Sequence, residues 1–147
     1  TAIEVDIYGH VNSTKVSGTR MMNGVGGSCD FTCNSMLATF TCGSTAKDGR
    51  ISSIVPFCSH VDHTEHYVDA IVTEYGVADL RNKCASEKAE ALIAIAHPDY
   101  RPLLREYLRI AQGYGGHTHH ILPAAFAMHD TFERKGDMRL TDFGEYL

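Results

Sequence analysis

The opening third of the chain alternates hydrophobic and polar residues with the period of a β-strand. In the stretch "AIEVDIYG", aliphatic residues from Ile3 to Ile7 alternate with Glu4 and Asp6. A period of two predicts a half-buried strand, with the acidic residues at its polar positions. The next stretch, "GHVNSTKVSG", is rich in turn residues and predicts a hairpin that leads into a glycine-rich segment.

A short helix and three extended stretches are predicted after that glycine-rich segment. Asp30 stands where it would cap a helix running through Leu37. The stretch "ATFTCGS" is then expected to be extended. "GRISSIVPF" predicts a core strand that ends near Pro56, and "YVDAIVTEYG" predicts a second one stopped by Gly76, because both are rich in β-branched residues.

The second half of the chain changes to the hydrophobic period of helices. Apolar residues recur at helical spacing from Ser86 until "HPD" ends the pattern. A second helix is predicted from Pro102 to Gly113, and a third from Leu122 to Gly136. Strands therefore come first and helices follow, which favours one α/β domain with helices packed on a central sheet.

Charge and hydropathy narrow the classes of partner. The 147 residues carry a formal net charge of -5, with 44% hydrophobic residues, and contain no cluster of Lys or Arg. A nucleic-acid partner is therefore not expected. No apolar run approaches the length of a membrane span, and no secretory signal opens the sequence, so a membrane partner is not expected either.

The cysteine pattern favours free thiols over disulfides. There are five cysteines, an odd number, and they form no C-x-x-C pair. This usage fits a reducing compartment, so we expect a cytoplasmic protein. Cys29 and Cys33 are four residues apart and would share a helix face, where two buried small side chains are favoured over a metal pair.

The glycine-rich stretch "MMNGVGGSCDF" is the first candidate for chemistry. Gly24, Gly26 and Gly27 permit a tight turn with exposed backbone N–H groups, next to a predicted helix start. Such groups suit an anionic ligand or an oxyanion hole, and a plain structural turn fits the spacing equally well. Neither a dinucleotide fingerprint nor a P-loop is present, because Cys29 replaces the third glycine and no Gly-Lys-Ser/Thr follows.

The other polar clusters carry weaker signals. "HVDHTEH" and "HTHH" hold side chains that zinc accepts, but they lack the H-E-x-x-H spacing, so solvated loops or caps are favoured. Glu74 follows a strand and is expected to be a solvated or capping residue. Lys47, judged alone, is an ordinary surface lysine. The cluster residues are His60, Asp62, His63, Glu65 and His66, then His117, His119 and His120.

Several stretches together resemble a known family. They are "VDIYGHVNST", "MMNGVGGSCDF", "ISSIVPFCSHVDHTEHYVDAIVTEYGVADLR" and "IAHPDYRPLL". From about residue 3 to about 110 the chain is similar to the C-terminal domain of the acetyl-CoA hydrolase/transferase family. That resemblance implies the α/β fold of class I CoA-transferases. The tail "GGHTHHILPAAFAMHDTFERKGDMRL" resembles the branch acting on 4-hydroxybutyrate, butyrate or similar short acyl groups.

The resemblance assigns roles to particular residues. In the family, the glycine-rich loop lies against the acyl-CoA thioester. Gly27 then matches the glycine whose N–H reaches the CoA or acyl oxygen, and Asn23 and Gly26 match CoA-site positions. Lys47 falls on the family's CoA-binding lysine. Cys29 is a departure, because the family usually has glycine there, and the histidine-rich motif around residue 63 is implied to be structural.

The resemblance also implies what this chain lacks. The family nucleophile is a glutamate that attacks acyl-CoA and forms a glutamyl-CoA thioester by ping-pong chemistry. That glutamate belongs to an upstream segment, so no catalytic side chain is expected within residues 1–147. We therefore expect a fragment, the C-terminal domain of a CoA-transferase, whose partners are the N-terminal half of the enzyme and a second copy in a homodimer.

The expected substrates are acyl-CoA and short carboxylic acids such as 4-hydroxybutyrate, butyrate, propionate or acetate. Coenzyme A is then a substrate, with no permanently bound cofactor and no metal. Two alternatives stay open. Water could replace the acceptor acid, which would make the enzyme an acyl-CoA hydrolase. The chain could also be a non-catalytic module that binds CoA, or a metal through its histidines.

Overall fold

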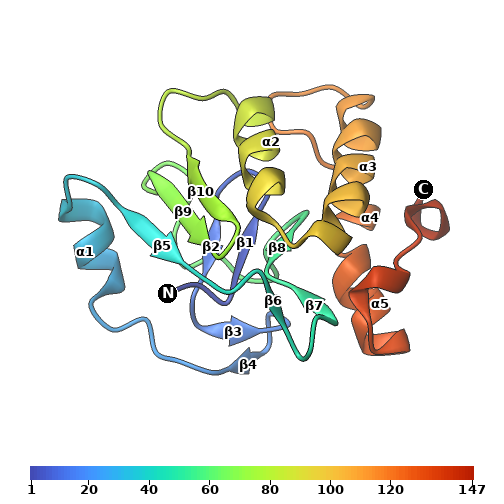
Figure 1. Ribbon diagram of the computed structural model, residues 1–147, viewed down its shortest axis with the longest axis horizontal. Coiled ribbons are helices and arrows are strands. Elements are labelled where there is room, and N and C mark those ends of the chain that lie inside the picture. The colour runs from blue at the N-terminus through green and yellow to red at the C-terminus, as the bar shows by residue number, and fades with distance from the viewer.

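A computed structural model describes residues 1–147. Two three-stranded sheets form its centre (Figure 1). In the first, β1 (Glu4–Asp6) pairs antiparallel with β2 (Val11–Asn12) and parallel with β8 (Ile54–Val55). In the second, β9 (Ala70–Thr73) pairs antiparallel with β10 (Gly76–Asp79) and parallel with β5 (Thr39–Thr41).

Two small hairpins extend from these sheets. The first joins β3 (Lys15–Val16) to β4 (Arg20–Met21) and leads into the glycine-rich segment. It lies later than the hairpin predicted within "GHVNSTKVSG", because β4 follows the end of that stretch. The second joins β6 (Thr45–Ala46) to β7 (Ile51–Ser52). The predicted strand in "GRISSIVPF" is thus two short strands, because Ser53 separates β7 from β8 and donates its N–H to Ser44.

Helices cover the sheets mainly on one side. α2 (Ala85–Ile95) packs against β9 and β10, and α3 (Arg101–Gln112) packs against α2 (Figure 1). Both helices confirm the predicted spans. Their apolar faces, with the strands, form one core whose fully buried members include Ile7, Ile54, Ile71, Leu92, Ile93 and Leu104. No helix is both long and apolar enough to cross a membrane.

Two helix predictions need correction. The first helix, α1 (Ser28–Asn34), begins before Asp30, because the Gly27 carbonyl already accepts the Phe31 N–H at 3.0 Å. Asp30 is therefore an acidic residue of the first turn, not the cap. The predicted third helix is broken at Phe126, whose φ of -108° and ψ of 10° leave the helical region. It consists of α4 (Leu122–Ala125) and α5 (Ala127–Lys135).

Two strand predictions were also wrong in detail. Gly76 begins β10 instead of ending the preceding structure, because its φ of +142° lets the chain reverse from β9 into an antiparallel partner. The first strand is not half-buried, since Glu4 and Asp6 are enclosed along with Val5. Both carboxylates accept hydrogen bonds from other segments of the chain, and these bonds offset the cost of burying their charge.

Candidate functional site

A cavity of about 440 Å³ opens beside the first residues of the chain. The start of β1, the hairpin β6–β7 and helix α5 form its walls. Asn23 and Lys47, both predicted from the sequence, line this one cavity although they come from different loops. Its apolar lining comes from Ala2, Ile3, Val16, Met22, Cys42, Ala46, Ile51, Phe132 and Met138. A concave, mostly apolar site with few polar groups is typical of small-molecule binding.

Lys47 holds its ammonium group over an aromatic ring. It lies in the turn between β6 and β7, with a left-handed φ of +49°. Its Nζ atom is 5.0 Å from the centre of the Phe132 ring on α5, a cation–π distance. No carboxylate pairs with this ammonium group, so its positive charge at the cavity wall is free to attract an anion.

Asn23 is exposed where the chain leaves β4. Its side-chain amide donates to the Ser13 carbonyl at 3.4 Å, which is long for a hydrogen bond. Its Oδ1 atom accepts no hydrogen bond within the chain. The amide therefore retains both donor and acceptor capacity toward a ligand in the cavity.

The glycines lie apart from that cavity. Gly26 has a left-handed φ of +55°, and a side chain there would meet nothing within 4 Å. Gly27 precedes α1, and neither glycine N–H donates a hydrogen bond within the chain. Both residues stand outside the lining of the 440 Å³ cavity, whereas Ser28 lines a second cavity of about 390 Å³. The structure thus places Asn23 and Lys47 on one cavity and leaves Gly26 and Gly27 outside its lining.

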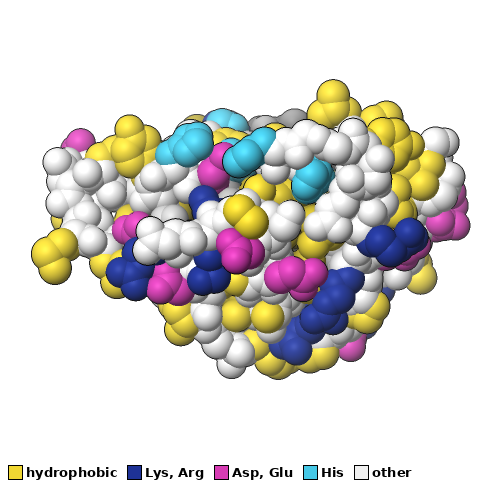
Figure 2. All heavy atoms as spheres, turned by 90° about the horizontal axis from the view of Figure 1, so that it is seen from above, with side chains coloured by type: hydrophobic (Ala, Val, Ile, Leu, Met, Phe, Trp, Pro, Cys, Tyr) yellow, Lys and Arg dark blue, Asp and Glu magenta, His cyan; other side chains and the backbone are white.

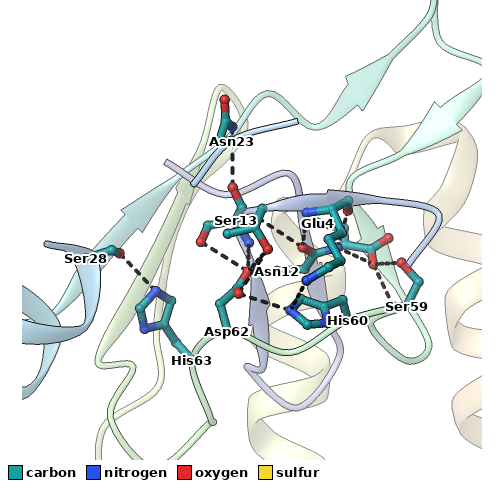
Figure 3. Close-up of polar contacts among 11 residues, drawn as sticks. Glu4, Asn12, Ser13, Asn23, Ser28, Ser59, His60, Asp62 and His63 are labelled. Atoms are coloured by element: carbon teal, nitrogen blue, oxygen red, sulfur yellow. Dashed lines mark hydrogen bonds and ion pairs between the residues drawn. The ribbon is translucent and has the colours of Figure 1, made fainter. Parts of the chain in front are cut away.

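The pair Glu4 and His129 also lines the 440 Å³ cavity, and sequence reasoning missed it. His129 Nε2 lies 2.8 Å from Glu4 Oε2. Asn12 and Ser59 donate hydrogen bonds to the other carboxylate oxygen, Oε1 (Figure 3). Burial acts to raise the pKa of Glu4, but the hydrogen bonds and the His129 charge outweigh it and lower that pKa. Only the place of Glu4 between the aliphatic Ile3 and Val5 could have signalled the pair.

Solvated loops or caps were predicted for "HVDHTEH", which holds for the exposed His66 but is wrong for His63. His63 is buried, and its Nε2 lies 2.9 Å from the Ser28 hydroxyl (Figure 3). The carboxylate of Asp62 accepts hydrogen bonds from Ser13 and Thr14. His10 contacts both Asp6, at 2.9 Å, and Glu65. No group of three such side chains is arranged to hold a metal ion.

The second histidine cluster divides between surface and core. His117 is exposed, as expected of a loop. His120 instead packs edge-on against Tyr8, and the Tyr107 hydroxyl lies 2.8 Å from its Nδ1 atom. Burial lowers the pKa of His120. Viewed from above, histidines gather toward one edge of this face (Figure 2).

Cys29 and Cys33 are exposed, which corrects the expectation that both are buried. Helix α1 has only seven residues and buries only Thr32, so neither thiol is covered. Glu74 is exposed, as expected, and accepts hydrogen bonds from the Ser44 N–H at 2.9 Å and the Ser44 hydroxyl at 2.5 Å. These bonds lower the pKa of Glu74.

Comparison with protein families decides the affiliation. The sequence profile of the acetyl-CoA hydrolase/transferase C-terminal domain matches residues 1–108. The chain belongs to this family. The succinyl-CoA:acetate CoA-transferase of Clostridium kluyveri is 56% identical over 95% of this chain and 26% of that protein. The propanoyl-CoA:succinate CoA transferase of Escherichia coli is 50% identical over 92% of this chain and 27% of that protein.

Other relatives are named for hydrolysis instead of transfer. An acetyl-CoA hydrolase of Schizosaccharomyces pombe is 47% identical over 95% of this chain and 29% of that protein. The chain therefore spans between a quarter and a third of the length of these curated relatives.

Solved structures confirm the predicted α/β fold class. RipA from Yersinia pestis superimposes with a TM-score of 0.69 and 27% identity, over 76% of this chain and 26% of that one. A 4-hydroxybutyrate CoA-transferase from Porphyromonas gingivalis gives a TM-score of 0.58 and 36% identity, over 74% of this chain and 25% of that one. The sheet-and-helix arrangement is thus that of the CoA-transferase family.

Proposed function

We propose that residues 1–147 form the C-terminal domain of an enzyme that transfers CoA between short carboxylic acids. The observation that carries the proposal is the 440 Å³ cavity shared by Asn23 and Lys47. Family membership supports it, since the relatives include two CoA-transferases at 50% identity or more. The whole enzyme's substrates are then acyl-CoA and carboxylates such as succinate, acetate, propionate, butyrate or 4-hydroxybutyrate.

The cavity suits the chemistry of coenzyme A. The apolar lining would accept the long neutral arm of CoA, and the amide of Asn23 would pair with its amide groups. The ammonium group of Lys47 would attract a CoA phosphate, for which a lysine acts as a point charge. Phe132 keeps that charge beside the cavity wall without neutralising it.

The proposed reaction needs a glutamate carboxylate from the upstream part of the enzyme. Its oxygen attacks the thioester carbonyl and the C–S bond breaks. CoA thiolate departs, and an acyl-glutamyl anhydride is formed. The thiolate then attacks the glutamyl carbonyl, which releases the first carboxylate and leaves a glutamyl-CoA thioester. An acceptor carboxylate reverses both steps, and no net proton is consumed.

Gly27 is proposed to act while negative charge develops on the thioester oxygen. Its N–H makes no hydrogen bond within the chain and precedes the first turn of α1. Such a fixed donor stabilises a forming oxyanion more than the ground-state carbonyl. Gly26, with its left-handed φ, gives the loop the turn that leaves this backbone uncovered.

A second candidate function is acyl-CoA hydrolysis, which the acetyl-CoA hydrolase relatives favour. The two functions differ only in what attacks the enzyme-bound intermediate. Release of CoA from acetyl-CoA or succinyl-CoA should be compared with and without an added acceptor acid. A transferase converts the acceptor acid into its CoA thioester. Without an acceptor acid it releases little free CoA. Equal CoA release in both samples, without a new ester, would contradict transfer and establish hydrolysis.

We also propose a cytoplasmic homodimer. The five free cysteines support the reducing compartment. The dimer rests on family resemblance alone, and sedimentation of the complete enzyme would test it. A sedimenting species with the mass of one chain would contradict it.

A further inference from the structure

The glycine loop, residues 22–28, has almost no support along its middle. A Cβ atom added at Gly24 or Gly26 would meet no atom within 4 Å, so the space on that side of both residues is open. Within the loop, one backbone hydrogen bond joins the Ser28 N–H to the Val25 carbonyl at 3.1 Å. The place of the loop therefore depends on how its two ends are attached.

The N-terminal end of the loop is hydrogen-bonded to the turn at Ser13 and Thr14. The N–H groups of Met22 and Asn23 both donate to the Thr14 carbonyl, at 2.8 and 3.2 Å. That turn is itself held by Asp62. The Asp62 carboxylate accepts the Ser13 N–H at 2.8 Å and the Thr14 hydroxyl at 2.9 Å (Figure 3).

The Asp62 carboxylate is built to keep these contacts. Burial acts to raise the pKa of Asp62, but hydrogen bonds from Ser13 and Thr14 outweigh it and lower that pKa. An ionised carboxylate accepts hydrogen bonds about twice as strong as a neutral group does. His60 adds a further contact to Oδ1 at 3.1 Å.

The second end of the loop is fixed by the neighbouring residue, His63. Its Nε2 atom lies 2.9 Å from the hydroxyl of Ser28, the first residue of α1. The ring is buried against Phe40, with centres 4.8 Å apart. Burial lowers the pKa of His63, so the neutral ring can accept a hydrogen bond from the Ser28 hydroxyl.

Both attachments rest on the same rigid base. Val11, fully buried in β2, donates its N–H to the His63 carbonyl at 2.9 Å. Its own carbonyl accepts the N–H groups of Asp62 and His63, at 2.9 and 3.1 Å. Two consecutive residues, anchored on the first sheet, thus reach the two ends of one loop.

We propose that Asp62 and His63 are positioning residues that clamp the glycine loop and set where Gly26 and Gly27 present their N–H groups. The inference rests on the proposed function of that loop and adds the residues on which its geometry depends. Placement within about 0.5 Å is what a preorganised oxyanion donor requires. The His63 contact is next to Gly27, and the Asp62 contact holds the end that carries Asn23.

Residue-resolved amide exchange tests the clamp without any substrate. Asp62→Asn should speed exchange of the Met22 and Asn23 amides about tenfold and leave the Ser28 amide unchanged. His63→Leu should instead speed exchange of the Ser28 and Phe31 amides about tenfold and leave the Met22 and Asn23 amides unchanged. His63→Gln, which can still bond to Ser28, should restore slow exchange. His66→Leu is the matched control, because His66 is exposed in the same segment and should change neither end.

A second variant covers the case in which His63→Leu fails to fold. Ser28→Ala removes the other partner of the same bond and leaves His63 in its buried place. It should reproduce the local effect at Phe31. Where His63→Leu does fold, a Ser28→Ala, His63→Leu double variant should add nothing further. Unchanged exchange at both ends, or faster exchange spread evenly over the whole chain, would overturn the clamp.

Kinetics of the complete enzyme separate positioning from mere stability. His63→Leu should lower kcat for acyl-CoA turnover about tenfold with KM unchanged, and Asp62→Asn should chiefly raise KM. Equal losses in the His66→Leu control would overturn the clamp. If the wild-type enzyme turns over no acyl-CoA while the exchange pattern is as expected, the proposed function fails and the clamp stands.

Discussion

The Nε2 atom of His129 lies 2.8 Å from Oε2 of Glu4, so one contact joins helix α5 to the first strand. Both side chains are nearly enclosed, with 11% and 8% of their surface exposed. The carboxylate also accepts hydrogen bonds from Asn12 and Ser59. Because α5 carries Phe132 as well, this contact holds the wall of the 440 Å³ cavity against which Lys47 rests.

Replacing Glu4 by Gln should therefore destabilise the fold. Removing one partner of a buried pair costs about 3 kcal/mol of unfolding free energy. Urea unfolding at pH 7 would measure the loss. Glu106→Gln is the matched control, since Glu106 is exposed and should change the unfolding free energy by less than about 0.5 kcal/mol.

The same pair gives a pH dependence with a defined sign. The folded-state pKa of Glu4 is lowered, so its stabilising contribution is present above pH 4.5 and is lost as the pH falls through the folded value. The gap in unfolding free energy between wild type and Glu4→Gln should therefore be widest near neutral pH and shrink below 4.5. A gap that stays constant down to pH 3 would contradict this.

How far the sequence predicts the fold depends on whether the signals are local. Helices α2 and α3 were predicted because their apolar spacing and their Pro and Gly punctuation lie within each segment. Burial of Glu4 could not be predicted, because its partners Ser59 and His129 lie 55 and 125 residues away. The same holds for Asp62 and His63, whose partners stand some 35 to 49 residues earlier.

The candidate site divides in the same way. Family resemblance singled out Asn23 and Lys47, and folding places both on one cavity. Sequence reasoning gave no signal for Phe132 under the Lys47 ammonium, since α5 meets the β6–β7 turn only after folding. Exposure of Cys29 and Cys33 could not be read from their shared helix face, because nothing local says that α1 packs so little.

Lys47→Gln should weaken CoA binding by the complete enzyme about tenfold, as expected for loss of one charge-assisted contact. Titration calorimetry with CoA at two ionic strengths would measure it, and the variant should show the smaller salt dependence. Lys83→Gln, a lysine that lines a different cavity, is the control and should bind CoA as wild type does. Equal affinity in both variants would remove Lys47 from the site.

Gly18→Ala should destabilise the hairpin that leads into the glycine loop. Gly18 has a φ of +68°, and an added Cβ would come within 2.5 Å of the Ser59 carbonyl oxygen. Strain and collision together should cost about 3 kcal/mol. Gly136→Ala, with φ of +78° but open space around it, isolates the strain and should cost about 1 kcal/mol in thermal unfolding. Equal losses would refute the collision.

Alkylation should sort the cysteines by their surroundings. Cys29, Cys33 and Cys84 are exposed and should react with iodoacetamide first. Cys42 should react slowly, because burial raises its pKa to about 11, and the buried Cys58 should not react. At pH 9, CoA should protect Cys42, which lines the cavity, and leave Cys84 unprotected. Mass mapping of the modified peptides measures the extent of alkylation at each cysteine. Equal alkylation of Cys42 with and without CoA would contradict the prediction.

The most direct test of the account is the intact mass of the complete enzyme after mixing with succinyl-CoA and no acceptor acid. Transfer through a glutamyl thioester predicts a covalent CoA adduct on one glutamate, which disappears when acetate is added. Lys47→Gln should form less adduct at the same acyl-CoA concentration, and Lys83→Gln should match wild type. No adduct and no loss of thioester, with acetyl-, propanoyl- and butyryl-CoA as well, would contradict the assignment of this chain to a CoA-transferase.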